Sequence, residues 1–147
     1  MAAGYSRLYS LLAAALLGFA CALACDSDST SPKVERRLAI IETSGDPVRV
    51  IVADTVARDT RLPVTVTTYG DGCFSKGETE VAVNGLFALV EPYDYVEMRS
   101  GCVGVLRVFT HEASVQFAEA GTATVRVMGR RTWESGVLSV DFTVVVQ

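Results

Sequence analysis

Cysteines are the residues of this chain whose surroundings say most about their chemistry. The 147-residue sequence contains four of them, Cys21, Cys25, Cys73 and Cys102, together with a single histidine, His111. Cys25 lies in the stretch ALACDSDSTSPK, between an apolar run and a short polar tract. A cysteine in such a place can form a disulfide, bind a metal or carry a covalent modification. The residues that precede Cys25 help to decide among these three roles.

The segment before Cys25 has the organisation of a secretory signal. One basic side chain, Arg7, precedes the uncharged stretch Leu8–Ala20, and small residues follow that stretch. This order is typical of a cleaved export signal. Counted as far as Ala24, the apolar run has 17 residues, which is the lower limit for crossing a bilayer. An uncleaved transmembrane anchor is therefore the alternative.

The sequence ALAC at 22–25 resembles the lipobox of bacterial lipoproteins, in which small or aliphatic residues precede an invariant cysteine. The resemblance implies that residues 1–24 are a removed signal peptide and that Cys25 carries a diacylglyceryl group. Its new amine would be acylated, for example with palmitate. Residues 25–34 would form the lipidated cysteine and a flexible polar tether to the bacterial cell envelope. Cys21, in GFAC, is the alternative lipidation site, although Phe19 is bulky near that cut.

Cys73 and Cys102 would be the two cysteines left in the mature chain. In an exported protein, a remaining pair of this kind most often forms a disulfide. Closing a loop of about 30 residues would stabilise the fold by roughly 3–4 kcal/mol. A zinc site needs four ligands at suitable spacing, and this chain has one histidine. We therefore predict a disulfide between these residues, and no metal or cofactor.

The charge of the mature chain bears on its partners. The sequence has 13 basic and 17 acidic side chains, and removal of Arg7 with the signal leaves 12 against 17, a formal charge of −5. A net acidic surface argues against nucleic acid as a partner, because phosphates require compensating Lys and Arg. Residues 35–147 are numerous enough for one domain with a real core.

Alternating polar and apolar residues predict that residues 35–147 form strands. In the segment 122–128, for example, Ala123, Val125 and Val127 share one face, as expected of a strand with one wet and one dry side. Segments of this kind recur at a spacing of roughly ten residues, and Asn84-Gly85 predicts a hairpin turn. The predicted strands are 36–42, 48–53, 63–69, 78–83, 86–90, 103–109, 114–118, 122–128 and 137–146. We expect an all-β, antiparallel β-sandwich of eight or nine strands.

The stretch EAGTATV at 119–125 resembles the E–F corner of immunoglobulin-like domains. Ala123 and Val125 stand where antibody domains place tyrosine and cysteine. The resemblance covers about the final third of the chain and implies an immunoglobulin-like sandwich. The Cys73–Cys102 bridge would then lie near one end of it, because both cysteines flank predicted strands.

Residues suited to catalysis are few. His111 lies in FTHEAS, a predicted turn, and no serine has the G-x-S-x-G surroundings of a nucleophile elbow. The acidic residues Glu91, Asp94 and Glu97 lack the spacing of a calcium loop. We therefore predict that the protein is not an enzyme. A small envelope hydrolase that uses His111 or a pair of carboxylates is the alternative.

Two loops carry residue types that favour binding. GRRTWESG at 129–136 would be a hairpin tip that presents Arg130, Arg131 and Trp133, and Trp and Arg dominate binding hot spots. Alternatively, Trp133 covers the edge of the core while the arginines stay in water. A second loop would present Tyr93 and Tyr95. We expect a tethered module that binds a protein, peptide or glycan partner through end loops. A structural module of an envelope assembly is the alternative.

Overall fold

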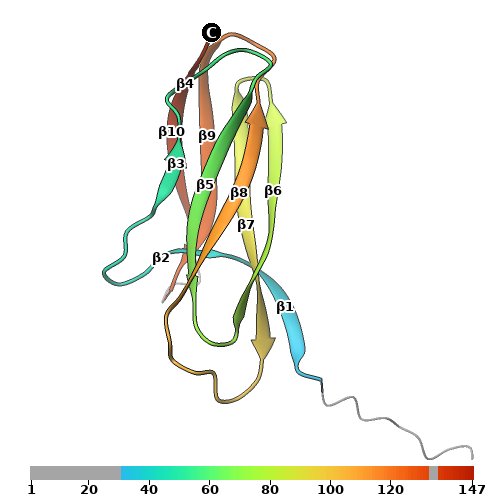
Figure 1. Ribbon diagram of the computed structural model, residues 1–147, viewed down its shortest axis with the longest axis vertical. Helices are drawn as coiled ribbons and strands as arrows, with labels where there is room; N and C mark the ends of the chain where they lie inside the picture. The colour runs from blue at the N-terminus through green and yellow to red at the C-terminus, as the bar shows by residue number, and fades with distance from the viewer. Residues whose placement is uncertain (1–30, 133–135) are drawn as a thin grey trace, which may run out of the picture. The chain divides into compact units, whose positions relative to one another are not determined.

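The computed structural model describes residues 31–132 and 136–147. Within these ranges the chain forms strands and no helix, and all the strands belong to one compact unit, Pro32–Gln147 (Figure 1). The all-β prediction is therefore confirmed. The strands are β1 (Lys33–Leu38), β2 (Ile40–Glu42), β3 (Val50–Val52), β4 (Thr55–Val56), β5 (Arg61–Gly70), β6 (Phe74–Asn84), β7 (Phe87–Met98), β8 (Arg107–Gln116), β9 (Gly121–Arg131) and β10 (Val137–Val146).

The strands β9 and β10 show most clearly how the sequence produces this fold. Ala123, Val125 and Val127 of β9 are fully buried, whereas the residues between them lie at least partly in solvent. β10 alternates in the same way along its whole length. The two strands pair antiparallel from Val137↔Arg130 to Val146↔Gly121, so their apolar faces lie on the same side.

Backbone pairing divides the strands into two groups. In the first group, β5 pairs antiparallel with β3 and with β8. In the second group, neighbouring strands pair in the order β6, β7, β9 and β10. In addition, β1 pairs with β7, and β4 pairs with β10. The short strand β2 joins the groups, because it pairs with both β5 and β9.

The sheet is mixed, whereas the sequence analysis expected antiparallel pairing. β7 and β9 run parallel, as do β2 and β9, and β4 and β10. Parallel neighbours need a crossover between them, and β8 supplies it for β7 and β9. Alternation within a strand shows which face is buried, but it carries no information about the direction of the neighbouring strand.

One apolar core lies between the two groups. In Figure 1, β5 and β8 cross in front of β7 and β9. Residues of both groups make up one buried cluster: Ile41, Leu62, Val64, Val66, Ala88, Val90, Val115, Phe117, Ala123, Val125, Val127, Val144 and Val146. Burial of these side chains is the main favourable contribution to folding.

The strand β8 lies where the sequence predicted two strands, 103–109 and 114–118, with a turn between them. Residues 101–106 are a loop, and β8 then runs without interruption through His111, which was expected in a turn. Its inward positions are Phe109, His111, Ala113 and Val115. The histidine and the small alanine interrupted the apolar pattern, which explains why two shorter strands were predicted.

The strand β7 is also longer than predicted. The expected loop with Tyr93 and Tyr95 is its second half, and this half pairs with β1 from Leu38↔Tyr93 to Lys33↔Met98. Asp94, between the two tyrosines, points inward and is fully buried. A buried carboxylate does not fit the usual apolar alternation, and the pattern therefore failed here.

The predicted β6–β7 hairpin is present, with its turn one residue later than expected. Asn84 pairs with Phe87, so the turn residues are Gly85 and Leu86. Gly85 has a φ of +57°, a conformation that glycine adopts without steric cost.

Candidate functional site at the disulfide end of the domain

The predicted disulfide is present and joins two loops at one end of the domain. The Cys73 and Cys102 sulfurs are bonded, with their Cα atoms 5.4 Å apart. Cys73 is buried and directly precedes β6, whereas Cys102 is exposed in the loop 99–106 between β7 and β8. We call this region, the loops 70–74 and 99–106 with their bridge, the disulfide end.

Hydrogen bonds fix both loops of the disulfide end. The Gly72 amide donates to the Val103 carbonyl at 3.0 Å, and the Val105 amide donates to the same carbonyl at 2.8 Å. The Cys73 amide donates to the Asp71 carboxylate at 2.8 Å. Arg107, at the start of β8, donates to the Phe74 carbonyl at 2.7 Å. The loop 99–106 is therefore held at Cys102, at Val103 and at its junction with β8.

Asp71 and the two sulfurs lie close together, within reach of a common ion. The sulfurs are oxidised in the disulfide, and metal binding by cysteine requires a thiolate. This set of donors therefore does not fit a metal.

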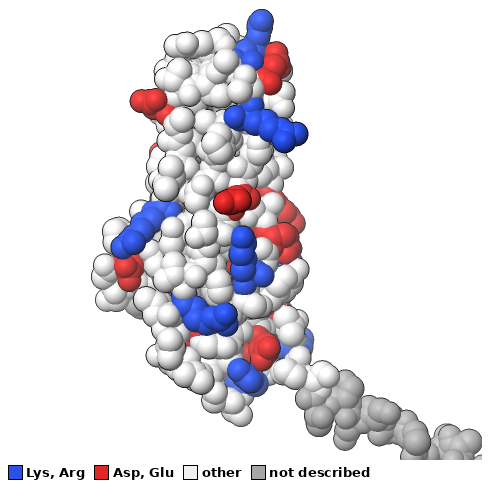
Figure 2. All heavy atoms as spheres, viewed as in Figure 1, with Lys and Arg blue, Asp and Glu red and all other residues white. Residues whose placement is uncertain are grey.

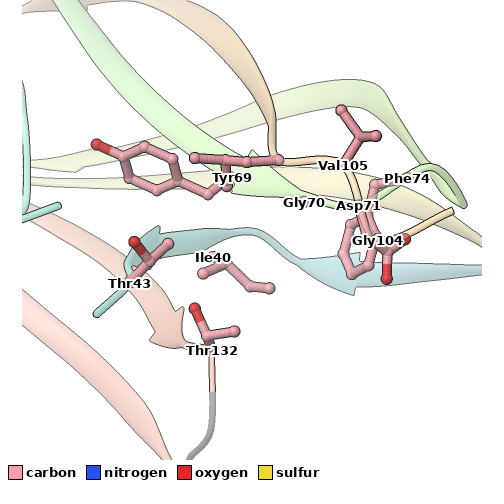
Figure 3. A pocket seen from close by; sticks show the side chains of 10 residues that line it. Ile40, Thr43, Tyr69, Gly70, Asp71, Phe74, Gly104, Val105 and Thr132 are labelled. Atoms are coloured by element: carbon pink, nitrogen blue, oxygen red, sulfur yellow. The ribbon is translucent and has the colours of Figure 1, made fainter. Parts of the chain in front are cut away.

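An open cavity of about 370 Å³ lies beside the bridge. In Figure 3, Tyr69 forms one wall, Ile40 and Thr132 lie opposite, and Phe74 and Val105 lie toward one end. Its full lining is Ile40, Thr43, Tyr69, Gly70, Asp71, Phe74, Gly104, Val105, Leu106 and Thr132. Apolar side chains make up most of this lining, and a few polar groups lie at its margin, as in many ligand-binding sites. We call it the apolar groove.

Tyr69 is the buried tyrosine in the lining of the apolar groove. Its side chain is 2% exposed, and its hydroxyl has no hydrogen-bond partner among the residues that the structure describes. Burial raises the pKa of Tyr69, and the charge of Asp46 raises it further, against the opposite effect of Arg49. The phenol therefore stays neutral at physiological pH.

The predicted binding residue Arg130 lies in β9, where it is half-buried. Its Nε donates to the Leu38 carbonyl at 2.6 Å, which links β9 to the end of β1. Burial lowers the pKa of Arg130, and the nearby positive charge of Arg37 lowers it further. Arg130 thus has a structural contact within the domain.

The neighbouring predicted residue Arg131 forms an ion pair at the end of β9. Its Nε lies 2.5 Å from the Glu42 carboxylate of β2. Trp133 lies outside the described residues, as do Cys25 and Cys21. The part of Arg130, Arg131 and Trp133 in binding stays a prediction.

Tyr93 and Tyr95 lie on the outer face of β7 among charged residues of β1 and β6. The Arg36 guanidinium lies 3.4 Å from the centroid of the Tyr93 ring, and Arg36 is hydrogen-bonded to Glu78 and Glu80. The Tyr95 hydroxyl donates to Glu78 at 2.7 Å. This bond and that of Arg36 hold the pKa of Glu78 at about 2, so the Glu78 carboxylate is charged at neutral pH.

The structure shows a buried polar network that the sequence analysis missed. His111 of β8 lies with Nε2 3.0 Å from Asp94 of β7 and with Nδ1 3.1 Å from the Thr79 hydroxyl of β6. The Thr68 hydroxyl of β5 donates to the second oxygen of Asp94 at 3.2 Å. Four strands of both groups therefore meet in these four side chains, which we call the buried network.

The buried network has the residue types of a catalytic triad, but a substrate could not reach its histidine in this structure. His111, Asp94 and Thr68 are each 0% exposed, and none of them lines the apolar groove. A general base must come within hydrogen-bond reach of its substrate. The arrangement can orient side chains and satisfy buried polar groups, which is a structural role.

Sequence reasoning also missed the apolar groove, because 103–109 was interpreted as a strand. The signal was present in GCVGVLRV at 101–108, where glycines and a cysteine interrupt any alternation of period two. A run of apolar residues with such interruptions favours a loop.

Within residues 31–132 and 136–147, no helix is long and apolar enough to cross a membrane. Comparison with protein families, curated proteins and solved structures finds no match to this chain.

Proposed function

We propose that this chain is a lipid-anchored protein of the bacterial cell envelope whose single β domain binds its partner, without catalysis, through the disulfide end. The anchor is supported by the lipobox-like ALAC sequence before Cys25 and by the polar tract after it. A disulfide in the domain is consistent with an exported protein. The observation that carries the binding function is the apolar groove, because an open cavity lined mostly by apolar side chains is suited to hold an apolar group.

For the fold, we propose an immunoglobulin-like sandwich. Two facing groups of strands over one core support it, as does the antiparallel pair β9–β10 that follows the corner-like sequence at 119–125. Ala123 and Val125 are fully buried, as the inward positions of that corner require. The parallel pair β7–β9 departs from the usual antiparallel pairing.

The chemistry of the apolar groove limits the kind of partner. Ile40, Phe74 and Leu106 offer no hydrogen bonds to sugar hydroxyls, and burying such hydroxyls without partners is unfavourable. The groove therefore favours an apolar side chain or acyl chain over a glycan. The face with Tyr93 and Tyr95 is the better place for a glycan, since its aromatic and charged groups can stack and hydrogen-bond.

A photo-crosslinking residue at position 106, in cells that express the full chain, tests this proposal. We expect covalent adducts from Leu106 at the disulfide end. The matched control is Ile51, an apolar side chain on β3 that is 74% exposed and does not line the groove. Equal adducts from both positions, or none from either, would show that the disulfide end is not a binding site.

A structural module is a second candidate, favoured by the edge of β10. Among the described residues, β10 has β9 on one side, and its other side pairs only at Val145 and Val146, with β4. An unpaired edge can accept a strand from a neighbouring chain. Sedimentation of the full chain would reveal this as assembly that increases with concentration.

A further inference from the structure

Four exposed apolar side chains lie at or next to the disulfide end, three of them in the loop 99–106 and Val108 just after it in β8. Val103, Val105, Leu106 and Val108 are between 56% and 61% exposed. The disulfide and the hydrogen bonds from Gly72 and Val105 hold this loop in place. Apolar side chains held out in water are energetically unfavourable unless something covers them.

The same end of the domain receives the chain from its N-terminal segment. β1 begins at Lys33, which pairs with Met98, the last residue of β7 before the loop 99–106. Val34 and Met98 are themselves 54% and 43% exposed. The start of β1 and the loop 99–106 both lie at the lower end of the domain in Figure 1. The exposed apolar side chains are thus close to the point where a lipid anchor would be attached.

The length of the connecting segment limits how far this end can move from a membrane. From Cys25 to Lys33 there are eight residue steps, which span at most about 28 Å when fully extended. The strand β7 has 12 residues and is about 40 Å long. An anchor at Cys25 would therefore hold the disulfide end within about 28 Å of the bilayer. The opposite end of β7 could lie about 40 Å farther from it.

Two basic side chains at this end are available to an anionic lipid headgroup. Lys76 and Arg107 have no carboxylate partner among the described residues, whereas Lys33 is paired with Glu35 and Arg99 with Glu97. Figure 2 shows Lys and Arg side chains among Asp and Glu side chains on the lower part of the visible face. Basic side chains beside apolar ones are typical of protein segments that lie in the membrane interface.

We propose that the disulfide end docks on the lipid surface that carries the anchor, with Val103, Val105, Leu106 and Val108 inserted among the lipid headgroups and upper acyl chains. This inference rests on the proposed lipid anchor and names the partner of the disulfide end as membrane lipid. The domain would lie against its membrane instead of swinging freely on its tether.

Fluorescence quenching by brominated lipids tests the docking. The lipidated full chain carries Trp133→Phe and one new tryptophan, Leu106→Trp, and is placed in phosphatidylcholine–phosphatidylglycerol vesicles with and without bromine on the acyl chains. We expect the emission of this tryptophan to fall roughly twofold or more in the brominated vesicles, because the quencher acts at contact in the hydrocarbon region. The matched control is Val83→Trp, near the β6–β7 turn at the other end of β6, where the emission should not change.

The outcomes separate the anchor from the docking. A mass spectrum of the same protein that shows no lipid on Cys25 would overturn the proposed function. A lipidated protein with no quenching at position 106, or with equal quenching at positions 106 and 83, would overturn the docking alone. Crosslinked adducts of protein mass in place of lipid mass at position 106 in cells would identify a protein partner and would also overturn it.

Discussion

His111 and Asp94 connect both groups of strands within the core. Thr79 and Thr68 complete the hydrogen bonds of this pair, so the network leaves few unsatisfied polar atoms. A buried polar group that loses its partner is costly. Loss of one of these side chains should therefore lower the free energy of unfolding, because its partner would stay buried without a hydrogen bond.

Replacement of His111 tests this role. We expect His111→Ala to lower the free energy of unfolding by roughly 3 kcal/mol, because Asp94 would stay buried without its main partner and a cavity would form. Urea unfolding followed by circular dichroism measures the change. The adjacent, exposed Glu112 is the matched control, and Glu112→Ala should change the stability by no more than about 0.5 kcal/mol. Equal effects of both variants would contradict the role of the network.

The Tyr95–Glu78 pair gives a prediction about pH. The pKa of Glu78 is about 2, below its ordinary 4.5, chiefly because the Tyr95 hydroxyl and then Arg36 donate to it. Since the folded pKa is lowered, this carboxylate stabilises the fold above pH 4.5, and the contribution is lost as the pH falls toward 2.

Tyr95→Phe should therefore raise the pKa of Glu78, as measured by NMR titration of its carboxyl carbon. Tyr93→Phe is the control, because the Tyr93 ring contacts Arg36 through its face and its hydroxyl is not part of this pair. A Glu78 titration that is the same in all three proteins would show that Tyr95 does not hold the carboxylate.

At the residue scale, the sequence predicted the bonded cysteines and missed the network. Two cysteines left in an exported chain have few alternatives to pairing. A histidine and an aspartate 17 positions apart give no such signal, because their contact depends on the packing of the β5–β8 pair against the β6–β7 pair. The positions of Arg130 and Arg131 depend in the same way on β1 and β2, which sequence periodicity did not place beside β9.

The disulfide determines the conformation of two elements, the loop 99–106 and the start of β6. Its residues are separated by 29 positions. We expect Cys102→Ser to lower the free energy of unfolding by roughly 3–4 kcal/mol in the chain-entropy model, as measured by urea unfolding. The wild-type chain under reducing conditions should show the same loss. A Cys102→Ser protein as stable as the oxidised wild type would contradict this contribution.

The contact of β2 with β9 depends on a glycine. A Cβ atom added at Gly129 would lie 2.6 Å from side-chain atoms of Ile41, which is fully buried. We expect Gly129→Ala to lower the free energy of unfolding by roughly 1–3 kcal/mol, since the core is already closely packed. Gly104→Ala is the control, because an added Cβ meets nothing within 4 Å there. Thermal unfolding should separate the two variants, and equal midpoints would contradict the predicted clash.

At the element scale, the sequence was most informative where apolar alternation is unbroken. β9 and β10 were predicted almost as observed, because every inward position is apolar or small. β7 and β8 were divided incorrectly because Asp94 and His111 occupy inward positions. Strand direction was not predictable, since β7 and β9 are parallel through long-range packing that no local pattern shows.

At the scale of the whole molecule, the proposed lipid anchor and the proposed binding site belong to the same end of the domain. The groove, the exposed apolar loop, the disulfide and the start of β1 all lie at one end of the domain. Composition alone predicted a single domain and an acidic surface. It could not show that apolar side chains of the loop 99–106 gather where the chain enters, because that depends on the pairing of β1 with β7.

The mass of the N-terminal peptide of the mature protein, extracted from bacterial membranes, tests the central claim most directly. We predict a peptide that begins at Cys25 and carries a diacylglyceryl group on sulfur and an acyl group on its amine, and Cys25→Ser should abolish this species while Cys21→Ser leaves it unchanged. An intact segment 1–24 with an unmodified Cys25 would contradict the account.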